Sequence, residues 1–158
     1  MEVRKIGVVG AGTMGSGIAQ VAAQSGFDVV LVDIAPNALA KGLATIDKSL
    51  ERLVAKGKLT VSERSAAREK IASAAELAAL AGCDLVVEAV VEKFEIKRQV
   101  LQALDAVLGP SAILATNTSS ISITRLAAAT ARPDRVIGMH FMNPVPVMKL
   151  VEVIRGYD

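Results

Sequence analysis

Short apolar runs alternate with amphipathic stretches along the chain, and this alternation is typical of an α/β protein. The apolar runs predict buried strands at residues 6–9, 29–32, 84–90, 112–115, 135–139 and 150–154. Apolar positions at helical spacing predict helices at residues 14–25, 37–57, 93–108 and 124–130. Strands that alternate with helices in this way imply a mainly parallel, doubly wound sheet.

Residues 35–80 contain more helix than a single crossover between strands requires. Pro36 suits the first turn of a helix, and Thr60 with Glu63 has the spacing of a capping box that opens another. We therefore expect this segment to be a helical hairpin inserted in the α/β pattern. No repeat, low-complexity tract or clear linker precedes residue 155, so we expect residues 1–158 to form one domain.

A glycine-rich loop joins the first predicted strand to the first predicted helix. Its G-x-G-x-x-G pattern comprises Gly10, Ala11, Gly12, Thr13, Met14 and Gly15. In a dinucleotide-binding unit the first glycine permits a tight turn, the second admits the pyrophosphate and the third lets the helix pack on the strand. The loop therefore predicts a Rossmann-like fold. A turn used only for packing, a flavin site and an S-adenosylmethionine site are the alternatives.

Asp33 ends the second strand of this unit, where an acidic residue accepts a hydrogen bond from the adenine ribose 2′-hydroxyl. The same charge repels a 2′-phosphate, and no arginine follows Asp33 directly. The sequence therefore favours NAD over NADP as cofactor.

His140 is the only histidine, and it follows an apolar strand at the edge where open α/β sheets bind ligands. Asn117 and Ser119 follow another strand and are expected at the same crevice. Glu152 lies on a segment that could run back beside His140, where its carboxylate would fix the imidazole tautomer. The other ring nitrogen could then take a proton from an alcohol as hydride leaves. A structural histidine, an exposed strand glutamate and a turn serine are the alternatives.

Three basic residues, Lys48, Arg52 and Lys56, share one face of the helix predicted at residues 37–57. Like charges at this spacing slightly disfavour a helix, so their segregation indicates an anionic ligand such as a phosphorylated substrate. A solvated helix face is the alternative. A single histidine and a single cysteine, far apart in the chain, predict no metal site.

Composition excludes several classes of partner. Eighteen basic and 16 acidic residues give a net charge of +2, which does not indicate a nucleic-acid partner. No apolar stretch reaches the roughly 18 residues of a membrane span, and the first residues lack a signal-peptide pattern. The lone Cys83 excludes an internal disulfide framework and indicates a reducing compartment. We therefore expect a cytoplasmic protein without a membrane partner.

Together these motifs resemble the L-3-hydroxyacyl-CoA dehydrogenase family, especially the bacterial 3-hydroxybutyryl-CoA dehydrogenases. Besides the glycine loop, the resemblance rests on residues 87–92 (VEAVVE), 116–120 (TNTSS) and 140–152 (HFMNPVPVMKLVE). It extends over essentially the whole chain. The resemblance implies the reversible oxidation of a (3S)-hydroxyacyl-CoA by NAD, a reaction of fatty-acid and butanoate metabolism.

The resemblance also implies roles for individual residues. His140 would be the catalytic base, Glu152 its dyad partner, and Ser119 a contact to the substrate oxygen and to coenzyme A. The residues placed around NAD, besides the glycine loop, are Asp33, Glu92, Lys97 and Asn143. Ser49 and Lys56 align with positions that hold coenzyme A.

Family members continue beyond residue 158 into a helical domain that forms dimers. The chain is therefore interpreted as the NAD-binding domain alone, with the helical domain absent, and a homodimer is expected only when that domain is present. A stand-alone NAD-binding module without catalysis and a related sugar-acid dehydrogenase remain the alternative functions.

Overall fold

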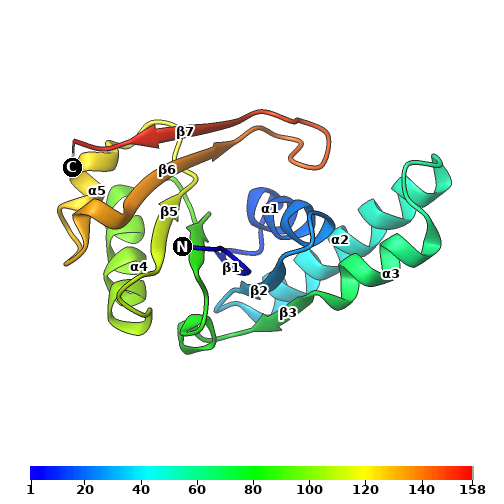
Figure 1. Cartoon of the computed structure of the whole chain (residues 1–158), viewed down its shortest axis with the longest axis horizontal. Coiled ribbons are helices and arrows are strands. Elements are labelled where there is room, and N and C mark those ends of the chain that lie inside the picture. Colours follow the sequence, from blue (N-terminus) through cyan, green and yellow to red (C-terminus); the bar gives the residue numbers. More distant parts are fainter. Residues whose placement is uncertain (158) are drawn as a thin grey trace.

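A seven-stranded sheet crosses the computed structural model, which describes residues 1–157 (Figure 1). Its strands are β1 (Lys5–Val9), β2 (Asp28–Val32), β3 (Ile71–Ala74), β4 (Leu85–Glu88), β5 (Ile113–Thr116), β6 (Val136–Phe141) and β7 (Val151–Arg155). Their order is β3-β2-β1-β4-β5-β6-β7, and only β6 and β7 pair antiparallel. The predicted mainly parallel, doubly wound sheet is confirmed.

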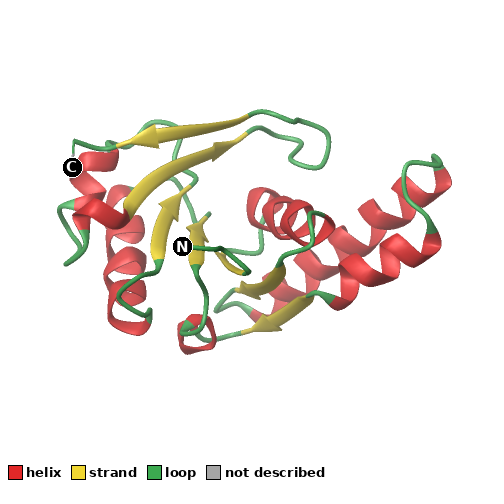
Figure 2. Cartoon of the chain, in the orientation of Figure 1, coloured by secondary structure: helices red, strands yellow, loops and turns green. Residues whose placement is uncertain are grey.

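Helices cover both faces of this sheet (Figure 2). They are α1 (Thr13–Gln24), α2 (Pro36–Ala55), α3 (Val61–Glu69), α4 (Phe94–Val107) and α5 (Ile123–Ala127), with short 3₁₀ turns at Leu77–Leu80 and Pro133–Arg135. Along β1, Val8 packs in the cluster under α1 while its neighbour Val9 packs in the cluster under α4. Because successive strand residues face opposite sides, a strand buried on both faces must be apolar throughout.

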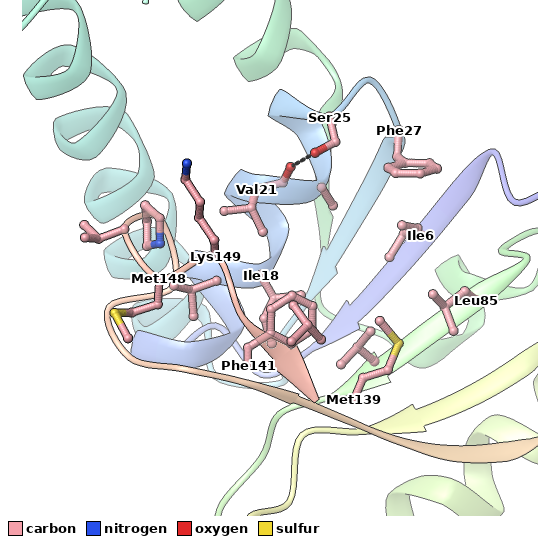
Figure 3. A pocket seen from close by; sticks show the side chains of 16 residues that line it. Ile6, Ile18, Val21, Ser25, Phe27, Leu85, Met139, Phe141, Met148 and Lys149 are labelled. Carbon is pink, nitrogen blue, oxygen red and sulfur yellow. Dashed lines mark hydrogen bonds between the residues drawn. The ribbon is translucent and has the colours of Figure 1, made fainter. Parts of the chain in front are cut away.

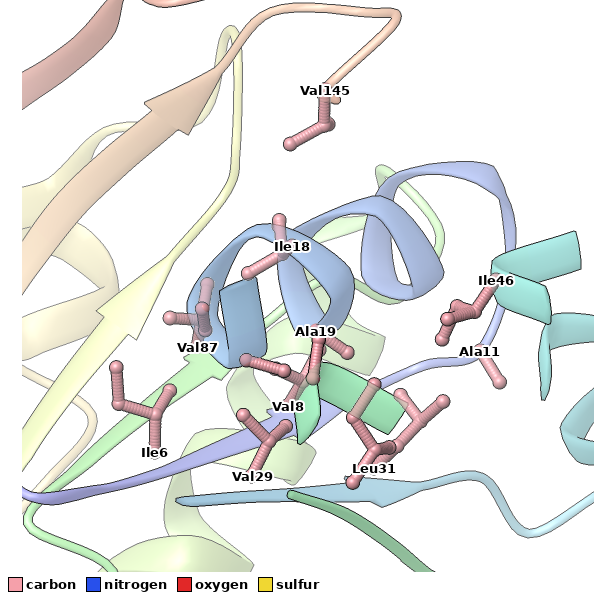
Figure 4. Packing of buried hydrophobic residues seen from close by; sticks show 14 of the residues in the cluster. Ile6, Val8, Ala11, Ile18, Ala19, Val29, Leu31, Ile46, Val87 and Val145 are labelled. Atoms are coloured by element: carbon pink, nitrogen blue, oxygen red, sulfur yellow. The ribbon is translucent and has the colours of Figure 1, made fainter. Parts of the chain in front are cut away.

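The core under α1 combines residues of the sheet with residues of α1, α2 and α3 (Figure 4). Val8, Leu31 and Val87 contribute from β1, β2 and β4, and Ile18 of α1 lies over them. Gly42 lets α2 approach the glycine loop, since a Cβ there would lie 2.6 Å from the Ala11 carbonyl oxygen. This packing places the start of α2 directly beside the loop.

The segment 35–80 is only partly the helical hairpin that was expected. Helices α2 and α3 form the hairpin and project beyond the sheet (Figure 1). The capping box is confirmed, because the Glu63 amide donates to Thr60 Oγ1 at 3.0 Å and the Thr60 amide to Glu63 Oε2 at 2.8 Å. The expectation is wrong for residues 71–74, which form the edge strand β3 parallel to β2. Pairing with β2 overrides the weak strand propensity of Ala72-Ser73-Ala74.

Within residues 1–157, no helix combines the length and the apolar character that crossing a membrane requires.

Asp84 fixes the start of β4 against β1. Its Oδ2 accepts hydrogen bonds from the backbone N–H groups of Arg4 and Lys5, each at 2.9 Å. These two hydrogen bonds hold the pKa of the Asp84 carboxyl below its ordinary value, because they favour the charged form. The bond from the Arg4 amide has the larger effect.

We predict that Asp84→Asn lowers the free energy of unfolding at neutral pH. The asparagine oxygen can accept the same two hydrogen bonds, but they are weaker because it carries no negative charge. Since the folded-state pKa is depressed, the stabilisation is present above the unfolded-state pKa of about 3.9 and is lost as pH falls through the folded-state value. Urea unfolding of both proteins should show a gap that closes in acid. A gap that does not vary with pH would contradict this explanation.

Candidate cofactor and catalytic site

The glycine loop between β1 and α1 has two glycines that the fold requires and one that it does not. Gly10 has φ +101°, and a Cβ there would lie 2.7 Å from the Ala89 carbonyl oxygen. A Cβ on Gly15 would lie 1.6 Å from the Gly10 oxygen. At Gly12, the N-cap of α1, a Cβ would meet nothing within 4 Å and no side chain caps the helix. The open space at this helix N-terminus suits an anionic pyrophosphate.

Asp33 lies beside this loop and is fixed by it. Its Oδ2 accepts the Ala11 amide hydrogen and its Oδ1 that of Ala35, each at 2.9 Å. A carboxylate offers about four acceptor positions, so capacity remains for a ribose diol. The half-exposed Asp33 is thus oriented at the end of β2.

His140 and Glu152 face each other across the antiparallel pair β6–β7. The two residues are partners in the strand register, and His140 Nδ1 lies 3.0 Å from Glu152 Oε2. The histidine side chain is 23% exposed and the glutamate 51%. An Nδ1–H donor to the carboxylate leaves Nε2 free to accept a proton. The predicted contact is present, and the pair is open to a substrate.

Glu92 and Ser119 meet where the loops after β4 and β5 touch. The Ser119 amide donates to Glu92 Oε2 at 3.2 Å, and Ser119 Oγ lies 3.5 Å from the same oxygen. Asn117 Oδ1 accepts the Phe141 amide hydrogen at 2.9 Å, next to His140 in the chain. These contacts gather predicted cofactor and catalytic residues at one edge of the sheet.

Lys97 is buried rather than exposed in the crevice, at 1% exposure. Its Nζ donates to Glu88 Oε1 at 2.7 Å and to the Val90 carbonyl oxygen at 3.2 Å. An ammonium has three N–H donors, so one N–H of Lys97 is left without one of these partners. A contact between Lys97 and NAD stays a prediction. Sequence reasoning did not single out Glu88, which ends β4 two residues before the predicted end of that strand. Its one signal was a carboxylate within an apolar run.

Cations of α2 line a cavity of about 230 Å³ between α1, α2 and the loop before β7. Lys48, Ser49 and Arg52 line it from α2, opposite Thr13 and Asn143. The structure thus brings two cations of the predicted stripe beside the glycine loop. Lys56, the C-cap of α2, is exposed and lies outside the residues that line this cavity.

A second cavity, of about 450 Å³, lies between α1 and one face of the sheet (Figure 3). Met139 and Phe141 of β6 line it together with Ile18 of α1. A Cβ on Gly138 would instead meet Ile123 of α5, so alternation along β6 directs His140 away from this cavity. Its lining is largely apolar, and it is separate from the histidine–glutamate pair.

No group of three or more His, Cys, Asp or Glu side chains in the described part of the chain could hold a metal ion.

Comparison with known proteins assigns a family to this arrangement. The family model described as "3-hydroxyacyl-CoA dehydrogenase, NAD binding domain" matches residues 5–158. The 3-hydroxybutyryl-CoA dehydrogenase of Bradyrhizobium diazoefficiens is 57% identical over 154 residues, which are 98% of this chain and 53% of that protein. A probable 3-hydroxybutyryl-CoA dehydrogenase of Deinococcus radiodurans is 56% identical, over 98% of this chain and 55% of that one.

A solved structure agrees. The crystal structure of (S)-3-hydroxybutyryl-CoA dehydrogenase from Ralstonia eutropha superposes with a TM-score of 0.96 at 51% identity, over 99% of this chain and 55% of that one. The chain therefore spans about half the length of the relatives it matches.

We predict that two glycine substitutions separate folding from cofactor binding. Gly12→Ala should keep the stability of the parent, because its φ of −73° suits alanine and the space is open. It should weaken NADH binding by about tenfold, since the new methyl group occupies the approach of the pyrophosphate. Gly15→Ala should lower the free energy of unfolding by about 1–3 kcal/mol or more. Urea unfolding and NADH fluorescence titration measure both. Undiminished NADH affinity of Gly12→Ala would contradict the assignment.

Proposed function

Since the chain belongs to the 3-hydroxyacyl-CoA dehydrogenase family and matches its NAD-binding domain, we propose that the protein oxidises (3S)-hydroxyacyl-CoA reversibly, with 3-hydroxybutyryl-CoA as substrate. The observation that carries this proposal is the His140–Glu152 pair, whose ring nitrogen and carboxylate oxygen lie 3.0 Å apart at the sheet edge. A stand-alone NAD-binding module would have no use for this pair.

NAD, when bound, supplies the hydride acceptor. In our proposal the glycine loop and the N-terminus of α1 bind its pyrophosphate, and Asp33 accepts from the adenine ribose. The remaining proposed contacts are Glu92, Lys97 and Asn143. Asp33 is held by two backbone amides, so it needs no rearrangement before it receives the ribose.

The proposed base is His140 Nε2. It takes the proton of the substrate hydroxyl group. The carbon atom that bears this hydroxyl gives up a hydride, for which NAD would be the acceptor, and its single bond to oxygen becomes the double bond of a carbonyl. Glu152, bound at Nδ1, fixes the tautomer and stabilises the imidazolium that forms. Ser119, held against Glu92, is proposed to contact the substrate oxygen. In the reverse direction the same nitrogen returns the proton to the carbonyl oxygen.

Coenzyme A is proposed to bind along α2. Lys48 and Arg52 line a cavity that also contains Thr13 of the glycine loop, so a phosphorylated chain in it would lead toward the cofactor. Ser49 lines the same cavity, and Lys56 would extend the positive face by one turn. Dimerisation through the helical part of the relatives, and a cytoplasmic location, stay predictions.

We predict that His140→Ala lowers the rate of NADH oxidation by acetoacetyl-CoA by about 10²–10⁴, because the proton donor is removed. The dissociation constant of NADH should not change, since the imidazole is paired with Glu152 rather than with the glycine loop. The loss of absorbance of reduced nicotinamide and a fluorescence titration measure the two quantities. A variant that turns over at the parental rate would contradict the role of base. A folded parent chain that binds NADH without turnover would mean that residues 1–158 are at most a binding domain.

We predict that Arg52→Glu weakens the binding of coenzyme A by about fivefold to tenfold at low salt, because the cation lines the proposed phosphate cavity. Lys41→Glu is the matched control, since it makes the same change of charge on an exposed position of the same helix, outside that cavity. Lys56→Glu tests the end of the stripe. Calorimetric titration with coenzyme A measures all three. Equal weakening by the Lys41 variant would mean general electrostatics, and no weakening by Arg52→Glu would favour a sugar-acid substrate.

A further inference from the structure

A buried ion pair lies beneath the loops that carry Glu92 and Ser119. Glu88 ends β4 with no exposed surface, and Lys97 lies in the first turn of α4 with 1% exposed. Their charged atoms are 2.7 Å apart. Removing two charges from water is costly, and hydrophobic side chains of similar volume often stabilise a fold as well or better. The contribution of this pair therefore lies in what it holds in place.

The first thing it holds is the loop after β4. Glu88 Oε1 accepts the Val90 amide hydrogen at 2.8 Å, and Lys97 Nζ donates to the Val90 carbonyl oxygen at 3.2 Å. Both backbone polar groups of Val90 are thus fixed by the same ion pair. Glu92 follows two residues later, so the carboxylate proposed for the NAD site starts from an anchored backbone.

The second thing it holds is the end of β5. The Thr116 hydroxyl donates to Glu88 Oε2 at 2.7 Å, and its oxygen accepts the Thr118 amide hydrogen at 3.3 Å. Thr116 is fully buried. A hydroxyl has one hydrogen to donate, so Glu88 sets its direction. The carboxylate therefore reaches the loop of Ser119 through one side chain.

The two loops meet again at their outer ends. The Thr118 hydroxyl and the Ser119 amide both donate to Glu92. The loops are thus joined at the base by Glu88 and Thr116 and at the outer end by Glu92. A shift at the base would move Ser119 relative to Glu92 and weaken these outer hydrogen bonds, because their strength falls steeply as distance and angle depart from the optimum.

We propose that Glu88, acting through Thr116, is a positioning residue that sets the placement of Ser119 against Glu92 and so couples the substrate side of the site to the cofactor side. Its consequence for turnover rests on the function proposed above. Its consequence for the positions of the two loops does not rest on that function, because these hydrogen bonds form within the chain without NAD or substrate.

Thr116→Val tests this most directly, since it removes the hydroxyl and keeps the shape of the side chain. Hydrogen exchange of the Ser119 amide, followed by NMR without ligand, should accelerate by about tenfold. Thr116→Ser retains the hydroxyl and should restore the parental rate. Glu88→Gln, which keeps an acceptor but removes the charge, should accelerate the same amide where it folds. An unchanged rate in Thr116→Val would overturn the proposal.

Asp105→Asn is the matched control for lost stability. Asp105 lies on α4, as Lys97 does, and its Oδ1 is 2.6 Å from Arg132 Nε in another largely buried ion pair. The hydrogen bonds of Asp105 are to Arg132 and the Ala131 amide, and none is to the loop of Glu92 or the loop of Ser119. It should leave the Ser119 exchange rate unaltered. Equal acceleration in this variant would show general loosening and overturn the proposal.

Turnover supplies a separate readout. Thr116→Val should lower kcat for acetoacetyl-CoA reduction by about tenfold, with the dissociation constant of NADH changed less than about twofold, and Thr116→Ser should restore kcat. A rise in the NADH dissociation constant alone would overturn the coupling. Failure of the unaltered chain to bind NADH would contradict the proposed function, while the exchange experiment would still decide the positioning role.

Discussion

β1 and β4 are adjacent parallel strands, and the chain leaves β1 toward β2 but leaves β4 toward β5 on the other side of the sheet. The loops at the carboxyl ends of β1 and β4 therefore separate around a crevice. The strand register places the ends in one row across the sheet. The residues in that row are Val32, Val9, Glu88, Thr116 and Gly138. Lys97, Glu152 and the proposed coenzyme A residues of α2 come from more distant positions, whereas the glycine loop, Asp33, Glu92, Ser119 and His140 each follow a member of the row within a few positions. Hydrogen bonding between strands, rather than any contact among the site residues, therefore brings them together.

This row also explains why polar side chains occur where they do. Inside the sheet both faces are covered, so a polar side chain in place of Val8, Val9 or Val86 would be buried without a hydrogen-bond partner. At the row itself Glu88 and Thr116 are still fully buried, and they can be polar because each of their side-chain polar atoms has a partner. In β4 and β5 the transition from apolar core to polar site thus takes place at the last residue of the strand.

Much of this arrangement follows from local sequence, because turn chemistry and periodicity act over short distances. The glycine loop, the capping box at Thr60 and the return of Glu152 toward His140 were all predictable on that basis. Strand β3 was not, since Ala72-Ser73-Ala74 becomes a strand only by pairing with β2. The ion pair of Glu88 with Lys97 was also missed, because its partners are separated by a loop whose course the sequence does not specify. The cavity behind Met139 depends on how α1 meets the loop before β7, which only packing decides.

The histidine–glutamate pair depends on a different constraint from the rest of the site. β6 and β7 are the antiparallel pair among the strands described, and directly opposed side chains in such a pair lie close together. A slip of one residue would turn Glu152 to the other face of the sheet, toward the apolar cavity beside Met139. The apolar residues of that face oppose the slip, since Val151 lines the cavity together with Phe141 and a glutamate in its place would set a charge against apolar side chains. The apolar cavity, which lies on the other face of the same two strands, therefore helps to keep the dyad in register.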